Sequence, residues 1–108
     1  MRLTLGQAID HVLRRLVELD EVRSPVCYQA SEAVYHLAGG KKAGLRAMRI
    51  NNGRHWFLEG PNGEIIDVTA GQFTKYNNNY QRLPSYRAAK GASFFPNKST
   101  LAKQLMKQ

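Results

Sequence analysis

The chain has 108 residues, 43% of them hydrophobic, which is enough to bury a core and excludes wholesale disorder. Its 16 Lys and Arg outnumber its 8 Asp and Glu, for a net charge of +8. No apolar run reaches the roughly 18 residues of a membrane span, and residues 1–16 lack the apolar core of a signal peptide. We therefore expect a single domain over residues 1–108, cytoplasmic and without a membrane contact. The one cysteine fits a reducing compartment, since it cannot form an internal disulfide.

A first helix is predicted to begin after Thr4. Gln7 follows at the spacing of a capping box, in which each side chain bonds the backbone N–H of the other residue. One face of this helix is apolar and predicted to be buried: Ala8, Ile9, Val12, Leu13, Leu16 and Val17.

A second helix is predicted to start at Ser24-Pro25. Serine is a favoured cap, and proline is favoured at the first helical position because its missing N–H would have no partner there. This start makes Cys27 about the third residue of the helix. The buried stripe is Val26, Ala30, Ala33, Val34 and Leu37, and Gly39-Gly40 is the expected end.

Three strands are predicted next, over residues 45–50, 55–59 and 64–68. Turn sequences separate them, Asn-Asn-Gly and then Gly-Pro-Asn-Gly, so an antiparallel meander is expected. Residues 74–93 indicate an irregular connection or a basic edge strand. Asn97 or Ser99 is expected to cap a short last helix that carries Leu101, Ala102, Leu105 and Met106. The predicted class is α+β, with N-terminal helices packed on a small antiparallel sheet and a short C-terminal helix.

Cys27 is a candidate nucleophile because of its place near a helix start. The partial positive charge and unpaired N–H groups there lower a thiol pKa and favour the reactive thiolate. The alternative is that Cys27 is a small buried apolar residue. Of the three histidines, His36 is expected to face away from Cys27, and His11 lies on the polar side of the first helix. His55 is therefore the candidate base.

Asp67 can reach His55 only with one particular hairpin register. A type I turn with Gly63 in the left-handed conformation gives a three-residue loop of Pro61, Asn62 and Gly63. His55 and Asp67 are then diagonal neighbours on one face, within side-chain reach. A two-residue loop would put them on opposite faces. Trp56, Leu58 and Ile66 should line the other face.

Three segments resemble a group of small proteins, many of them encoded by bacteriophages: CYQASEAVYHLAGG (27–40), HWFLEGPNGEIIDVTAGQF (55–73) and YRAAKGASFFPNKSTLAKQL (86–105). The resemblance covers most of residues 24–106. The order of a cysteine at a helix start, a histidine on one strand and an aspartate on the next also resembles papain-like and transglutaminase-like thiol enzymes.

This resemblance implies a papain-like or transglutaminase-like core and a cysteine hydrolase or acyltransferase of protease, deamidase or amidase type. Cys27 would be the nucleophile, His55 the base and Asp67 the residue that orients His55. The substrate would be a peptide or another amide, and the resemblance to phage proteins implies a host protein as target and the host cytoplasm as location. Papain-like enzymes place a glutamine a few residues before the cysteine, and residues 18–25 contain none. The backbone N–H of Cys27 would be the first oxyanion donor. Gln29, Gln72 and Trp56 are the candidates for a second donor or for substrate contacts.

The alternative function is a binding module without catalysis. Residues 1–67 hold nine basic and eight acidic residues, whereas residues 68–108 hold seven basic residues and no acidic one. Basic side chains interleaved with aromatics can bind nucleic acid or an acidic host protein, and the candidates are Lys75, Arg82, Arg87 and Lys90. Otherwise these charges face water. Neither a zinc-ligand spacing nor a phosphate-binding loop is present, so no metal or cofactor is expected.

Overall fold

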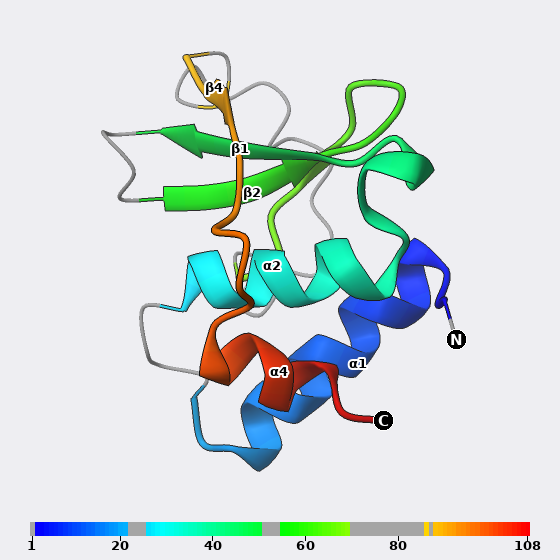
Figure 1. Ribbon diagram of the computed structural model, residues 1–108, viewed down its shortest axis with the longest axis vertical. Helices are drawn as coiled ribbons and strands as arrows, with labels where there is room; N and C mark the ends of the chain where they lie inside the picture. The colour runs from blue at the N-terminus through cyan, green and yellow to red at the C-terminus, as the bar shows by residue number, and fades with distance from the viewer. Residues whose placement is uncertain (1, 22–25, 51–54, 70–85, 87) are drawn as a thin grey trace.

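Helices and strands occupy separate layers of the molecule (Figure 1). The computed structural model describes residues 2–21, 26–50, 55–69, 86 and 88–108. In chain order the elements are α1 (Leu5–Glu18), α2 (Cys27–Leu37), the 3₁₀ helix η1 (Gly40–Ala43), β1 (Arg46–Ile50), β2 (His55–Glu59), β3 (Ile65–Ile66), β4 (Lys90–Ala92) and α4 (Thr100–Met106). Within these residues the predicted class is confirmed: α+β, with N-terminal helices, a four-stranded antiparallel sheet and a short C-terminal helix.

The first helix begins as the sequence predicts. The Gln7 N–H donates to the Thr4 hydroxyl at 3.2 Å, and the Thr4 N–H donates to the Gln7 side-chain oxygen at 3.0 Å, so the capping box is complete. The buried face consists of Ala8, Ile9, Val12 and Leu16. The prediction for Val17 is wrong, because its side chain is 66% exposed. It lies about 100° round the helix from Leu16, beyond the packed face.

The second helix begins later than predicted. Val26 is its cap residue, with no side-chain cap, so Cys27 is the first helical residue and not the third. Ser24 and Pro25, on which the prediction rested, lie outside the described residues. The C-terminal end agrees with the prediction, because the helix stops at Leu37 and Gly39 adopts a left-handed conformation with φ of +100°. Gly39 has no Cβ to oppose that conformation.

The sheet has the strand order β3-β2-β1-β4, and its consecutive strands β1, β2 and β3 form the predicted antiparallel meander. β4 pairs with β1 as the opposite edge strand, so an edge strand is present at the end of the predicted 74–93 segment, of which residues 74–85 and 87 lie outside the described residues. The third strand is shorter than predicted, because only Ile65 and Ile66 join the ladder. Val68 is 2% exposed and belongs to the helix-side core, so the chain leaves the ladder to bury it.

The loop between β2 and β3 has the predicted length of three residues. The Gly60 N–H donates to the Glu64 carbonyl at 2.8 Å and closes the loop, and Gly63 lies in the left-handed region with φ of +80°. The pairs that follow are Glu59 with Ile65 and Leu58 with Ile66. Continuing this register puts His55 and Asp67 on the same face as diagonal neighbours.

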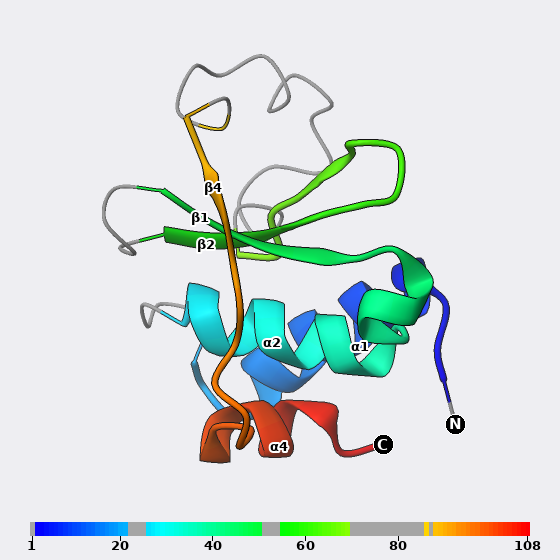
Figure 2. The same ribbon diagram turned by 45° about the horizontal axis from the view of Figure 1, so that its top comes forward.

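The layers stack in the order sheet, α2, then α1 together with α4 (Figures 1 and 2). The larger core fills the space between the sheet and the helices and includes Leu58 and Ile66, as predicted. A smaller cluster of Met48, Ile50 and Phe57 lies on the other face of the sheet, against Tyr86 and Ala89. His55 and Asp67 share the face of this smaller cluster.

The last helix is fixed at its start by a buried acid. Ser99 is its cap residue, and the Ser99 hydroxyl accepts from the Ala102 N–H at 3.2 Å. Glu32 of α2 is 0% exposed and accepts from the Ser99 hydroxyl at 2.9 Å. At the other end, the Arg15 guanidinium donates to the Gln104 carbonyl at 3.0 Å. Of the two predicted caps, Ser99 is the one used.

Candidate active site

His55 and Asp67 are in direct contact, as the hairpin register requires. His55 Nε2 lies 2.5 Å from Asp67 Oδ2. The carboxylate is almost fully buried at 2% exposure, whereas the His55 side chain is 29% exposed. Asp67 therefore holds the ring from the protein side and leaves part of the imidazole open to solvent.

Two further hydroxyl groups bind the Asp67 carboxylate. Tyr86 donates to Oδ2 at 2.6 Å, and Thr69 donates to Oδ1 at 3.4 Å. The Tyr86 ring packs edge-on against Phe57, with the ring centroids 5.0 Å apart. Both carboxylate oxygens are thus occupied, which fixes the orientation of the side chain that contacts His55.

Sequence reasoning missed the role of Tyr86. It predicted an irregular connection around that residue and counted Tyr86 among the aromatics of the basic segment. Tyr86 lies 19 residues from Asp67, and no spacing rule relates residues across such a connection. Its phenol is nevertheless an ordinary donor for a buried acid.

Cys27 and Ser31 are one turn apart on α2, and Ser31 fastens this part of the helix to the start of β2. The Ser31 hydroxyl donates to the Trp56 carbonyl at 3.3 Å. Ser31 is 1% exposed, so this bond is shielded from water. The Cys27 and His55 side chains are hydrogen-bonded to each other. His55 thus contacts Asp67, and its interaction with Cys27 is among the causes that shift the pKa of both side chains.

The thiol is partly buried but acidic. Burial raises the pKa of Cys27, and four other effects outweigh it: the hydrogen bond with His55, the backbone hydrogen bond from Trp56, the charge of His55 and the backbone hydrogen bond from Tyr28. The pKa of Cys27 consequently lies below its ordinary value of 9.0. Opposite charge and hydrogen bonds to the thiolate are the usual causes of such a shift.

The imidazole is correspondingly more basic. The hydrogen bond with Asp67, helped by the bond with Cys27 and by both negative charges, raises the pKa of His55 to about 10 against the effect of burial. Both shifts favour the charged forms, a thiolate on Cys27 and an imidazolium on His55.

The remaining candidates are placed differently. Trp56 contributes its backbone to the Cys27 environment, while its ring packs on Tyr28 with the centroids 4.8 Å apart. Gln29 lies about 200° round α2 from Cys27, and its buried Oε1 has no hydrogen-bond partner among the described residues. Lys90 is exposed on β4. The other candidates lie outside the described residues: Gln72, Lys75, Arg82 and Arg87.

Comparison of the chain with family models, curated proteins and solved structures gives no match. Among the described residues, no helix combines the length and the apolar character that crossing a bilayer requires. The same part of the chain contains no group of three or more His, Cys, Asp or Glu side chains arranged to hold a metal ion.

Proposed function

We propose that this protein is a cysteine-dependent amide hydrolase or acyltransferase. Cys27 is its nucleophile, His55 its acid and base, and Asp67 the residue that positions His55. The observation that carries the proposal is the contact of His55 Nε2 with the buried Asp67 carboxylate at 2.5 Å, and the lowered pKa of Cys27 and raised pKa of His55 support it. Reactive thiols and their bases are where such paired shifts are expected.

In the proposed reaction the Cys27 thiolate attacks the carbonyl carbon of an amide and forms a C–S bond. Nε2 of His55 is engaged by Asp67 at 2.5 Å, which leaves Nδ1 to carry the proton shared with the thiol. His55 gives that proton to the amide nitrogen as the C–N bond breaks, and a thioacyl group remains on Cys27. Water or an amine then attacks the thioacyl carbon, His55 takes its proton, and the thiolate leaves.

The carbonyl oxygen becomes negative in the tetrahedral intermediate and needs hydrogen-bond donors. We assign the backbone N–H of Cys27 to this role, because the first N–H groups of a helix have no partner within it and point off its start. The helix start also supplies partial positive charge. Gln29, on another side of the helix, is better suited to packing than to this role.

The order of elements adds support from resemblance. A cysteine at a helix start, a histidine on one strand and an aspartate on the next follow the order of papain-like and transglutaminase-like thiol enzymes. We extend the proposal to a core of that kind and to a phage-encoded accessory protein acting on a peptide or amide in the host cytoplasm. Hydrolysis, deamidation and transfer share the same thioacyl intermediate and differ only in the leaving and entering groups.

The test is turnover of peptide anilides with varied acyl residues, followed by release of the aniline. We expect release by the unmodified protein, none by Cys27→Ser, and a rate lower by about 100-fold or more for His55→Ala. Acid-quenched samples should carry the acyl group on Cys27, seen by mass spectrometry. Release that persists unchanged in Cys27→Ser, or no acyl transfer from any donor to Cys27, would refute the proposal.

A further inference from the structure

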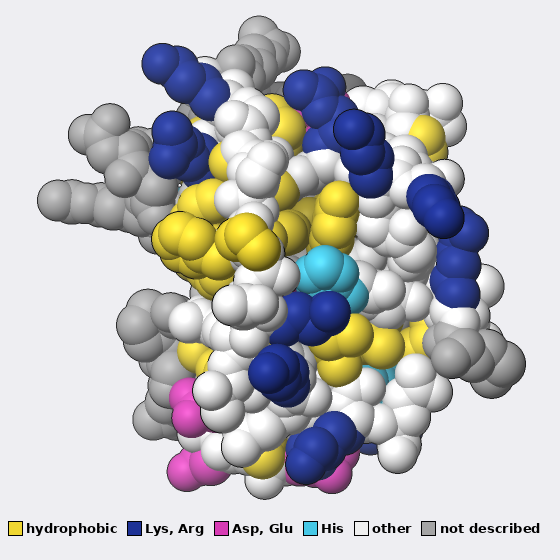
Figure 3. All heavy atoms as spheres, viewed as in Figure 1, with side chains coloured by type: hydrophobic (Ala, Val, Ile, Leu, Met, Phe, Trp, Pro, Cys, Tyr) yellow, Lys and Arg dark blue, Asp and Glu magenta, His cyan; other side chains and the backbone are white. Residues whose placement is uncertain are grey.

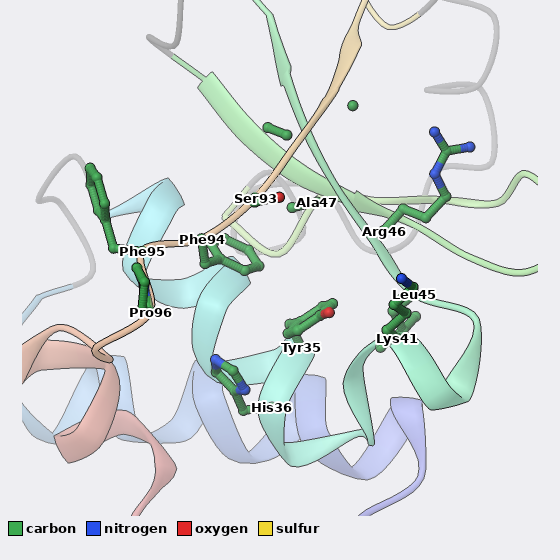
Figure 4. Close-up of a pocket in the computed structure, with 12 residues that line it drawn as sticks. Tyr35, His36, Lys41, Leu45, Arg46, Ala47, Ser93, Phe94, Phe95 and Pro96 are labelled. Carbon is green, nitrogen blue, oxygen red and sulfur yellow. The ribbon is translucent and has the colours of Figure 1, made fainter.

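A groove opens on the face that Figure 3 presents. Its volume is about 550 Å³, and it lies between α2, η1, β1 and residues 91–96. Figure 4 shows Tyr35 and Phe94 side by side at its centre, with His36 on the helix below them. The Phe94 and Tyr35 rings are in contact, their centroids 5.2 Å apart. An aromatic surface thus forms the middle of the groove.

This aromatic surface continues to the neighbours of the candidate nucleophile. Phe94 packs on Trp56 with a centroid distance of 5.7 Å and on Tyr28 at 5.3 Å. Tyr28 follows Cys27 in α2, and Trp56 follows His55 in β2. Phe94 therefore links the groove to the residues that follow Cys27 and His55 in the chain.

The groove is basic. Lys41 and Arg46 line it, and none of the described residues that line it carries a carboxylate. The charge of Lys98 also reaches His36, where it and burial lower the pKa of the imidazole. Arg46 has one acidic neighbour, Glu59 on β2 at 3.3 Å, and this pair is exposed to solvent. In Figure 3 the yellow apolar surface is bordered by blue basic side chains, and the magenta acids lie at the lower edge of the view.

One wall of the groove is low. Gly91, Ala92 and Ser93 line it together with Ala47, the strand partner of Ala92, and none of the four has a side chain larger than that of serine. Small side chains let the backbone of a ligand come close, while the rings of Tyr35 and Phe94 offer flat apolar contact. This shape suits an extended chain better than a compact molecule.

We propose that this groove binds an extended acidic polypeptide segment that also carries apolar side chains. Its carboxylates would face Lys41 and Arg46, and an apolar side chain would lie on Tyr35 and Phe94. That the segment is part of the substrate, next to the amide attacked by Cys27, rests on the proposed function. Acidic peptide is favoured over nucleic acid because only two Lys or Arg side chains among the described residues, Lys41 and Arg46, line the groove, whereas a nucleic-acid strand carries a negative phosphate at every nucleotide.

Binding is measured by fluorescence anisotropy on the Cys27→Ser protein, so that no turnover interferes. The probe is a fluorescein-labelled peptide that alternates glutamate with leucine or phenylalanine. A second peptide replaces every glutamate by lysine, and a single-stranded oligothymidylate serves as the nucleic-acid probe. We expect the acidic peptide to bind, and its affinity to fall as salt is raised.

Matched variants locate the binding. Lys41→Glu should weaken it by about threefold to tenfold, whereas Lys42→Glu, on the same 3₁₀ helix but not lining the groove, should change it by less than about twofold. Ser93→Trp, at an exposed position, should block the groove without disturbing the core.

The proposal is overturned if the lysine peptide binds as tightly, if Lys41→Glu and Lys42→Glu behave alike, or if no peptide binds. It is overturned equally if the oligothymidylate binds more tightly than the acidic peptide and if Lys41→Glu weakens the binding of the oligothymidylate as well. Binding without anilide turnover by the unmodified protein would remove the proposed function and keep the groove. Anilide turnover without peptide binding would keep the proposed function and remove the proposed role of the groove.

Discussion

Replacing Asp67 by asparagine should make His55 a much weaker base. The substitution keeps the size of the side chain and removes its charge, so packing against Tyr86 is retained. The hydrogen bond with Asp67 is the largest of the effects that raise the pKa of His55 to about 10. An opposite charge in contact typically shifts a pKa by about one to three units, so the variant should titrate between about 7 and 9.

The assay is nuclear magnetic resonance of the histidine ring protons across a pH series. The chain has 3 histidines, and the spectrum of His55→Gln identifies the signals of His55. The rate of anilide release should fall by about 10-fold to 1,000-fold with the lost positioning and charge. A His55 pKa unchanged in Asp67→Asn would refute the reasoning, because the carboxylate would then contribute nothing to the ring's basicity.

The same variant should change how stability depends on pH. A raised histidine pKa means that the folded protein holds a proton that the unfolded chain gives up at its ordinary pKa of 6.5. This contribution is complete below 6.5 and is lost as pH rises through about 10. The lowered pKa of Cys27 acts in the opposite sense, since its contribution is complete above 9.0 and is lost as pH falls through the folded-state value. On a Cys27→Ser background only the histidine contribution remains. The urea midpoint should therefore decrease as the pH is raised above 6.5, and Asp67→Asn should make this decrease smaller.

Three further substitutions test other parts of the structure. Tyr86→Phe keeps the ring and removes one donor to Asp67, so anilide release should slow by about threefold to tenfold and the alkaline limb of its pH profile should shift to lower pH. An unchanged profile would remove Tyr86 from the site. Ser99→Ala removes the cap of α4 and a partner of buried Glu32, so urea unfolding should show a loss of about 1–2 kcal/mol, and a change within error would contradict the account of that helix start. Gly63→Ala puts a Cβ at φ of +80° with no atom within 4 Å of it, so we expect a loss of about 1 kcal/mol from backbone strain alone, and a stabilised variant would contradict the left-handed assignment.

The parts of the fold that local chemistry determines could be predicted from the sequence. The Thr4 capping box and the loop of Pro61, Asn62 and Gly63 each depend on a few adjacent residues, and both are confirmed. That loop is what brings His55 to Asp67, so this half of the site followed from turn chemistry together with the two-residue period of a strand.

Features that depend on contacts between distant segments could not be predicted. Helical periodicity alone does not say how wide the buried face is, and Val17 falls beyond the contact with α2. Tyr86 contacts Asp67 although 19 positions separate them in the chain. The groove is likewise a product of packing, because its central residues Tyr35 and Phe94 are far apart in the sequence.

The central claim, that Cys27 is held as a thiolate by His55, is tested most directly by the pH dependence of alkylation with iodoacetamide. Because the chain has a single cysteine, the mass of the intact protein reports Cys27 alone. We predict a rate midpoint below 9.0 for the unmodified protein and a midpoint displaced upward in His55→Ala. A midpoint at or above 9.0 that His55→Ala leaves in place would contradict the account.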